Sequence, residues 1–313
     1  MEFSIEKRIF AHGFIKFKDN VMKLNHLSGS YALVGCLILT ASLLLASCTS
    51  KPIATTSGAK NLFPNTYALD DDESTITWIK DNQGTTMHDA GLFPDATPEV
   101  IAELGLQYGI ASTISCFLLH ADGKWALFDT GLGIGKGQLI TVLDSLNVSP
   151  ESISELFITH FHGDHIGGMV YEGKPVFPNA EVYVGQREYD AWINEMPKEN
   201  TRMQREAMDV YKNRLHFFQF GDTLTHGIVC IDAVGHTPGH TVFQKGNLLV
   251  IGDLLHGAAL QIPHPEICAR FDMDKEQAVA SRIRILKYAA DNNLLMAGMH
   301  LPEPAFIKPG QAK

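Results

Sequence analysis

The 313-residue sequence is poor in cysteine and in positive charge. It has five cysteines, and Cys116, Cys230 and Cys268, which lie beyond the amino-terminal region, are odd in number and widely spaced. They indicate small buried residues and do not imply a disulfide framework. Lys and Arg number 25 against 35 Asp and Glu, so the formal net charge is −10. Because binding to nucleic acid depends on a surplus of Lys and Arg, this balance argues against a nucleic-acid partner.

The sequence also has little continuous apolar character, apart from Tyr31–Leu45. This run is short for a membrane span, follows Lys23 and His26, and precedes small residues, as in a secretory signal. It ends in Leu45–Cys48 (LASC), which resembles the lipobox of bacterial lipoproteins. The resemblance implies cleavage before Cys48 and a lipid anchor on its thiol, which predicts attachment to a bacterial membrane in the periplasm or at the outer membrane. An uncleaved signal anchor is the alternative, and it also places the domain outside the cytoplasm.

The sequence divides into three parts. Residues 1–47 are predicted to be the signal leader, although a start at Met22 would give a more usual signal. Residues 48–74 are predicted to be a tether, because Lys51–Lys60 is polar and contains Pro and Gly. Residues 75–313 are predicted to form one domain, whose composition is ordinary for a globular protein.

Short apolar runs and amphipathic segments alternate in the predicted domain. Two runs split by Ala-Asp-Gly predict a hairpin, and Gly246-Asn247 predicts a second tight turn between strands. The predicted strands are Ile114–His120, Lys124–Asp129, Leu156–His160, Glu181–Val184, Ile228–Val234, Thr241–Lys245, Leu248–Ile251 and the apolar part of Leu294–His300. The predicted helices are Gln138–Leu146, Arg187–Asn194, Arg202–Asn213 and Lys275–Ala290. This mixture predicts an α/β fold with two packed mixed sheets and helices outside them.

The segment Thr159–Gly168 (THFHGDHIGG) holds three histidines and one aspartate directly after an apolar strand. In an extended chain His160 and His162 face the same side, so both imidazoles can bind one ion. Asp164 and His165 follow at the start of a helix and point to a neighbouring position. Gly163 is expected to allow a sharp turn, and Gly167-Gly168 to allow close backbone packing. The segment therefore predicts donors for two metal ions.

Three segments downstream offer further donors. The first is Gly235–His240 (GHTPGH), in which Pro238-Gly239 has the residue order of a type II turn that would present His240. Asp253 and His300 each end an apolar strand. A single histidine at a strand end is more often a structural residue than a ligand. Polar donors at the ends of four apolar strands instead predict one shared cleft at a sheet edge.

Taken together and in order, these motifs resemble those of the metallo-β-lactamase superfamily, from about Ile114 to His300. The resemblance implies a four-layer αβ/βα sandwich with two divalent metal ions, most often zinc, with manganese or iron as alternatives. It implies that Asp129 in Leu127–Gly131 (LFDTG) supports the site without binding metal, and that His236 is structural or adjacent to the ligands. The implied ligands are His160, His162 and His240 for the first ion, Asp164, His165 and His300 for the second, and Asp253 as the bridge.

The resemblance further implies a hydrolase in which a hydroxide shared by the two ions attacks a small-molecule substrate. Asp253 argues against penicillin cleavage, since the zinc β-lactamases lack an aspartate that bridges the metals there. Acyl-homoserine lactonases usually have a tyrosine three residues beyond this aspartate, whereas this chain has His256. The stretch from Gly252 onward looks most like the methyl parathion hydrolase branch, which predicts an ester, lactone or phosphotriester substrate. His256 and His264 are candidates to line the pocket or to be ordinary surface histidines.

Other functions fit parts of the same pattern. A persulfide dioxygenase of this fold would be an oxidoreductase with one iron, and the presence of Asp253 and both histidines of the second site argues against it. A nuclease of this fold would need additional domains and positive charge. A metal-binding lipoprotein without catalytic activity is the remaining alternative. Members of the methyl parathion hydrolase branch also continue beyond the last metal histidine, so we expect an exposed sheet edge near the end of this chain.

Overall fold

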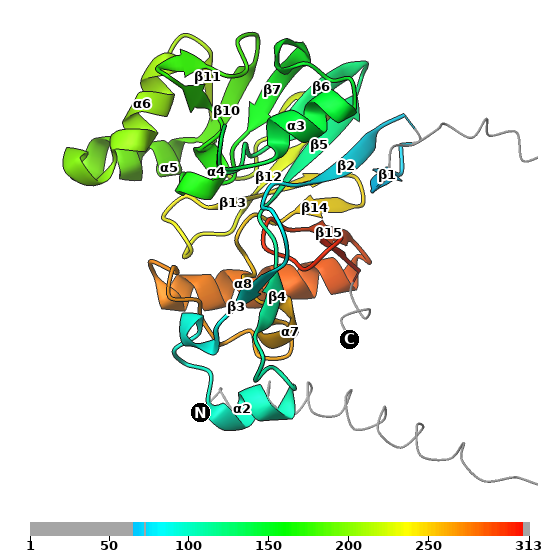
Figure 1. The fold of residues 1–313 in the computed structure, drawn as a ribbon, viewed down its shortest axis with the longest axis vertical. Helices are drawn as coiled ribbons and strands as arrows, with labels where there is room; N and C mark the ends of the chain where they lie inside the picture. The colour runs from blue at the N-terminus through cyan, green and yellow to red at the C-terminus, as the bar shows by residue number, and fades with distance from the viewer. Residues whose placement is uncertain (1–64, 72, 309–313) are drawn as a thin grey trace, which may run out of the picture. The chain divides into compact units, whose positions relative to one another are not determined.

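The computed structural model describes residues 65–71 and 73–308 (Figure 1). The predicted leader, Cys48 and most of the predicted tether lie outside these residues. Among the helices of the described residues, none is long and apolar enough to cross a membrane.

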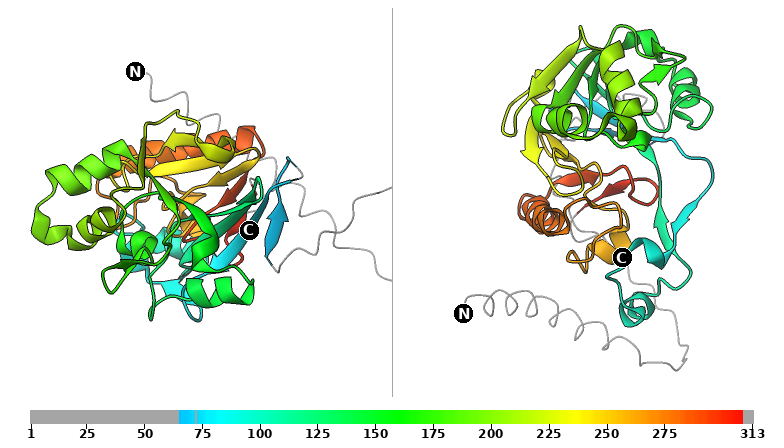
Figure 2. Two further views of the ribbon diagram at one scale, coloured as in Figure 1. Left: turned by 90° about the horizontal axis from the view of Figure 1, so that it is seen from above. Right: turned by 90° about the vertical axis from the view of Figure 1, so that its left-hand side faces the viewer.

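Two mixed sheets form the centre of the described part, as predicted (Figures 1 and 2). The larger has the order β1 (Thr66–Ala68), β2 (Thr75–Lys80), β5 (Ser115–Ala121), β6 (Lys124–Phe128), β7 (Ile153–Phe157), β10 (Glu181–Gly185) and β11 (Leu215–Phe218). The smaller has the order β12 (Val229–Asp232), β13 (Thr241–Lys245), β14 (Leu248–Val250), β15 (Leu295–Ala297) and β16 (Phe306–Ile307). The four strands β6, β7, β10 and β11 run parallel, as do β14 and β15, and the other pairs in these sheets are antiparallel.

Alternation along β5 shows how the sequence builds the layers. Phe117 and Leu119 face the apolar core between the two sheets, where Phe117 shares a cluster with Phe243 of β13. Cys116 and Leu118 face the opposite side and join the core beneath the helices. This is the two-residue period expected for a strand that is buried on both faces.

Helices cover the outer face of each sheet, which confirms the predicted four layers. The helices α3 (Leu139–Ser145) and α6 (Arg202–Val210) pack on the larger sheet, and α8 (Lys275–Asp291) packs on the smaller one. Two further helices, α4 (Gly163–Ile166) and α5 (Gln186–Tyr189), are short, and α5 continues into a π-helical segment at Asp190–Glu195. The predicted helix at Arg187–Asn194 is therefore present but changes its hydrogen-bonding pattern halfway.

An excursion between β2 and β5 was not predicted. It contains β3 (Thr86–His88), α2 (Pro98–Glu103) and β4 (Ile110–Ser112), and it packs against α7 (Ala258–Gln261) around a small third core (Figure 2). Its strands are three residues long, too short to show a period in the sequence. The remaining hairpin consists of β8 (Val170–Tyr171) and β9 (Lys174–Pro175).

Two boundaries differ from the prediction. The larger sheet begins with β1 at Thr66, inside the predicted tether, because Thr66–Ala68 pairs with Thr75–Thr77 of β2. At the other end of the chain, β16 pairs with β15 and forms the last strand of the smaller sheet, beyond the final predicted metal histidine.

Candidate metal centre

The predicted metal-binding turn lies at the carboxyl end of β7. The strand ends at Phe157, and Phe161 is fully buried between the two histidines that flank it. His160 Nε2 lies 3.2 Å from His162 Nδ1, so both imidazoles point to the same place. Helix α4 then begins at Gly163 and carries Asp164 and His165. The turn therefore presents donors in two directions, as predicted.

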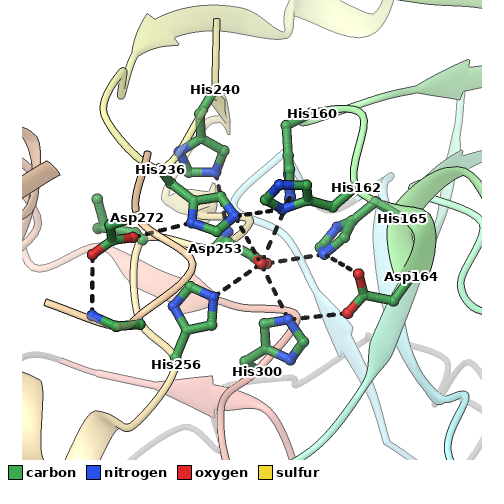
Figure 3. Close-up of polar contacts among 12 residues, drawn as sticks. His160, His162, Asp164, His165, His236, His240, Asp253, His256, Asp272 and His300 are labelled. Carbon is green, nitrogen blue, oxygen red and sulfur yellow. Dashed lines mark hydrogen bonds and ion pairs between the residues drawn. The ribbon is translucent and has the colours of Figure 1, made fainter. Parts of the chain in front are cut away.

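Asp253 lies at the centre of the cluster, three residues after β14 (Figure 3). Its Oδ1 is 3.1 Å from His165 Nε2. Its Oδ2 faces the Nε2 atoms of four other histidines, at 3.6 Å for His160, 3.3 Å for His236, 3.2 Å for His256 and 3.1 Å for His300. Strands that are far apart in the sequence thus bring their donors to one carboxylate.

The described residues contain four overlapping groups of possible metal donors, and two of them include residues of the predicted turn. In the first, His160, His162, His236 and Asp253 each place one donor atom within 4.8 Å of the others. In the second, Asp164, His165 and His300 do the same. Asp253 also lies against the second group through the contact of its Oδ1 with His165. The geometry fits two ion positions that share Asp253.

The structure differs from one ligand assignment predicted from the sequence. His236, the first histidine of GHTPGH, joins the first group, and His240 does not. Both ring nitrogens of His240 are already engaged, since Nε2 accepts a hydrogen bond from the Asp253 backbone N–H at 3.0 Å and Nδ1 lies 3.0 Å from the Ala233 carbonyl. His240 therefore holds the Asp253 backbone in place through this hydrogen bond.

The residues of the cluster fit a divalent metal. Within the described residues, His165 Nε2 and Asp253 Oδ1 are buried and make no hydrogen bond, although they lie 3.1 Å apart. Buried polar atoms without partners are costly, so a group that satisfies both would stabilise the site. Imidazole nitrogens combined with carboxylate oxygens are typical zinc ligands.

Electrostatics divides the histidines into two kinds. Burial and the neighbouring His236 lower the pKa of His162 to about 3, so it is a neutral donor at ordinary pH. Burial also lowers the pKa of His300, but Asp253 and Asp164 outweigh this and raise it to about 10. His165 shows the same balance, and its pKa is raised by Asp253, Asp164 and Asp129. Without metal, protons on these imidazoles neutralise the buried carboxylates.

Two buried carboxylates hold the ligand segments in place. Asp129 accepts hydrogen bonds from the Thr159 backbone N–H at 2.8 Å and from the Thr159 hydroxyl at 2.7 Å, and it lies 2.7 Å from His165 Nδ1. This matches the supporting position predicted for Asp129. Glu188, which the sequence did not reveal, accepts from the Phe161 N–H, the Thr237 hydroxyl and the Gly239 N–H, each at 2.8 Å. It therefore joins the first metal-binding segment to GHTPGH.

The other two candidate histidines, His256 and His264, lie in different places relative to the site. His256 is buried, and its ring stacks on that of His300 with centroids 5.1 Å apart, so it belongs to the site. His264 is partly exposed and pairs with Glu266 at 3.3 Å, outside the donor groups. His88 on β3 was missed by the sequence analysis. Its ring lies 6.5 Å from that of His300, and its buried Nε2 makes no hydrogen bond.

The fold and the donor cluster define a metal-dependent hydrolase. The chain belongs to the metallo-beta-lactamase superfamily, whose family model matches residues 109–292.

Among solved structures, the chain is similar to the hydrolase AbOPH of the beta lactamase superfamily, at 26% identity and a TM-score of 0.69, over 79% of this chain and 94% of that one. It is also similar to AidC, described as a dizinc quorum-quenching lactonase, at 29% identity and a TM-score of 0.69, over 77% and 91% of the two chains.

Curated relatives match a shorter region. The exodeoxyribonuclease WalJ of Streptococcus pneumoniae, from strains D39 and R6, is 30% identical over 140 residues. The match covers 43% of this chain and 46% of the relatives, so it spans less than half of their length.

Proposed function

We propose that this chain hydrolyses lactones and neutral esters, with phosphotriesters as further substrates, by means of two zinc ions bound around Asp253. The observation that carries the proposal is the pair of donor groups that adjoin at this carboxylate. The similarity to AidC, a lactonase by its description, extends over most of both chains and supports the same substrate class.

We assign the first ion to His160, His162 and His236, the second to Asp164, His165 and His300, and the bridge to Asp253. Two bound zinc ions supply Lewis-acid activation of water and of the bond that is cleaved. The protein residues fix the donors. Asp129 orients His165 through Nδ1, and the Thr113 carbonyl lies 2.8 Å from Nδ1 of His300. Each imidazole is thereby held with Nε2 toward Asp253.

Charge near the cluster favours neutral substrates. Arg282 is paired with Asp272 and Lys275 with Asp95, so carboxylates already offset these two cations. A dianionic phosphate monoester would gain little from them, whereas a lactone or ester needs no such partner. The unpaired Nε2 of His88 is a candidate hydrogen-bond donor to a substrate oxygen.

Exonuclease activity is the second candidate, because the curated relatives are exodeoxyribonucleases. The net charge of −10 opposes it, since a polyanionic strand requires cations to offset its phosphates. An iron-dependent persulfide dioxygenase would instead hold one metal ion per chain. The methyl parathion hydrolase branch remains our choice within the superfamily.

A substrate panel tests these alternatives. The purified zinc-loaded protein should be assayed with a homoserine lactone, an aryl acetate, a phosphotriester, and single- and double-stranded DNA with free ends. We expect turnover of the lactone and the aryl ester, and loss of at least 100-fold in kcat/KM in His162→Ala. Activity on DNA alone would overturn the proposal in favour of the nuclease, and one iron per chain would favour the dioxygenase.

We also propose that the chain acts outside the cytoplasm, attached to a bacterial membrane through lipid on Cys48. The apolar run and the LASC sequence support this. Metabolic labelling with a palmitate analogue should mark the wild-type chain and not Cys48→Ser. Equal labelling of the two would contradict the anchor.

A further inference from the structure

An ion pair is buried behind the first donor group. Asp272 lies in the loop before α8, and Arg282 lies on α8. Arg282 Nη2 is 2.9 Å from Asp272 Oδ2, and the two side chains are 1% and 0% exposed. Taking a charge pair out of water is costly, so such a pair persists only where its remaining donors and acceptors are satisfied.

Asp272 contacts a proposed metal ligand directly. Its Oδ1 lies 3.0 Å from His236 Nδ1 (Figure 3). Its Oδ2 accepts a hydrogen bond from the Ala269 N–H at 3.2 Å in addition to the bond from Arg282. With the Nδ1 proton facing Asp272, the Nε2 lone pair of His236 faces His162 and Asp253, at 2.9 and 3.3 Å. The carboxylate thus selects the tautomer that binds metal and makes Nε2 a stronger donor.

Arg282 reaches a second proposed ligand through the backbone. Its Nε donates to the Leu254 carbonyl at 2.9 Å, and Leu254 directly follows Asp253. Its Nη1 donates to the carbonyls of Pro265 and Ile267, at 2.9 and 3.1 Å. One guanidinium therefore joins the segment that carries Asp253 to the carboxylate that orients His236.

Contacts of the same loop and helix fix His236 further. The Met273 N–H donates to the His236 carbonyl at 3.2 Å, and the Asp274 N–H donates to the Gly235 carbonyl at 2.8 Å. A Cβ atom at Gly235 would lie 2.0 Å from the Ala278 backbone N, so α8 packs tightly on GHTPGH. Displacement of this loop would move His236.

We propose that Asp272 and Arg282 are positioning residues of the metal centre. By holding His236 and Asp253 in place, they set the affinity of the first metal position for its ion. The inference rests on the proposed function only in that the donor groups bind a divalent ion. It adds a buried charge pair on α8 to the residues that determine metal binding.

A purely structural pair is the competing explanation, and replacing the pair by apolar residues separates the two. Well-packed hydrophobic residues often restore or raise stability in place of a buried ion pair. We therefore compare Asp272→Asn, Arg282→Lys and the double variant Asp272→Leu/Arg282→Met with the wild type. Arg284→Gln is the matched control, because Arg284 lies two residues further along α8, is exposed, and donates to the Asp232 carbonyl.

The measurements are zinc per chain after dialysis, the zinc dissociation constant from competition with a chromophoric chelator, and the visible spectrum of the cobalt-substituted protein. The melting temperature of each metal-free protein reports stability separately. We expect about 10- to 100-fold weaker zinc binding at one of two positions in Asp272→Asn and in the double variant, the range known for partners of metal ligands. Arg282→Lys should fall between these and the wild type, and Arg284→Gln should match the wild type.

The decisive comparison is between the double variant and the wild type. Weaker zinc binding and an altered cobalt spectrum at an unchanged metal-free melting temperature would support positioning. Wild-type zinc affinity in both Asp272→Asn and the double variant would overturn it. Should the double variant not fold, Asp272→Asn and Arg282→Lys give the same test through the cobalt spectrum.

These readouts do not depend on turnover. A wild-type protein that binds two zinc ions but turns over no substrate would overturn the proposed function and leave this inference standing. A wild-type protein that binds no zinc would overturn both.

Discussion

His240 and Asp253 are joined by a hydrogen bond that runs from the Asp253 backbone N–H to His240 Nε2, at 3.0 Å. The other nitrogen of this ring, Nδ1, lies 3.0 Å from the Ala233 carbonyl. His236, four residues earlier, directs Nε2 to the donor group and Nδ1 to Asp272. The two histidines of GHTPGH therefore make different contacts, and we propose that only His236 binds metal.

Substitution of these two histidines should have separable effects. We predict that His236→Ala loses about one zinc ion per chain and at least 100-fold of kcat/KM, because a ligand of the first position is removed. His240→Gln should keep two zinc ions but lose about 1–3 kcal/mol of stability, since it disturbs a buried hydrogen-bonded group. Metal analysis and chemical denaturation measure both. Zinc loss in His240→Gln together with retention in His236→Ala would reverse the assignment.

Metal binding should release protons. Asp253 and Asp164 outweigh the effect of burial and raise the pKa of His300 to about 10. Both ring nitrogens of His300 therefore carry a proton at neutral pH in the metal-free protein, and the ring is positively charged. A bound ion must displace one of these protons, and the apparent zinc affinity should rise by about tenfold per pH unit for each proton released. Calorimetric titration at pH 7.5 in buffers of different ionisation enthalpy measures the number of protons. A value of zero would contradict the prediction.

The raised pKa of His300 also makes the stability of the metal-free protein depend on pH. The pKa of His300 is higher in the folded state than its ordinary value of 6.5, so its protonation stabilises the fold. This contribution is fully present below pH 6.5 and is lost as the pH rises through about 10. Denaturation of the metal-free protein at pH 7, 8.5 and 10 should show falling stability. The zinc-loaded protein is the control, and it should lose less over this range.

The three glycines of THFHGDHIGG should respond differently to alanine. A Cβ atom at Gly168 would lie 2.1 Å from the Thr130 carbonyl oxygen, and one at Gly167 would lie 2.5 Å from that of Gly163. At Gly163 the nearest heavy atom would be Met203 Sδ at 3.6 Å. We predict that Gly168→Ala costs about 1–3 kcal/mol through overpacking, whereas Gly163→Ala is tolerated.

Thermal unfolding of the metal-free variants measures this difference, with Gly163→Ala as the matched control. Because Thr130 Oγ1 donates to the His165 carbonyl at 2.9 Å, Gly168→Ala should also weaken zinc binding. Equal stability of the two variants would contradict the packing argument. The chain turns at Gly163 as expected, but Gly163 is not among the positive-φ glycines and begins α4, so its backbone angles do not require glycine.

Much of the scaffold could be predicted because its signals are local. The β5–β6 hairpin, strand β13 and helix α8 lie within a residue or two of their predicted bounds, because alternation, turn residues and helical spacing determine them over short stretches. The excursion that carries His88 was missed, since its strands and helix are short and are held by contacts with α7. Such contacts leave no periodic pattern in the sequence.

The sequence also predicts only part of the metal centre. His160, His162 and His165 could be predicted because one short segment carries all three. The choice between His236 and His240 depends on Asp272, 36 residues beyond His236, and on the Ala233 carbonyl, and neither contact is visible in GHTPGH. The sequence does contain one signal for Asp272. The stretch FDMD immediately before α8 has two aspartates, and the helix needs only Asp274 as its N-cap.

Removal of the metal should lower the stability of the folded protein. The cluster holds buried donors without hydrogen bonds, and a ligand that binds only the folded state stabilises it by about 4 kcal/mol at a free concentration 1,000 times its dissociation constant. For a domain of this size that corresponds to about 10 °C in melting temperature. Calorimetry before and after chelation, followed by restoration with zinc, manganese or calcium, measures the effect. Zinc should restore the melting temperature and calcium should not, because calcium prefers six to eight oxygen ligands.

The control is Asp253→Asn, which should melt at nearly the same temperature with and without zinc if the carboxylate joins the two positions. Equal melting of the wild type before and after chelation would mean that the ring nitrogens facing Asp253 do not hold a metal.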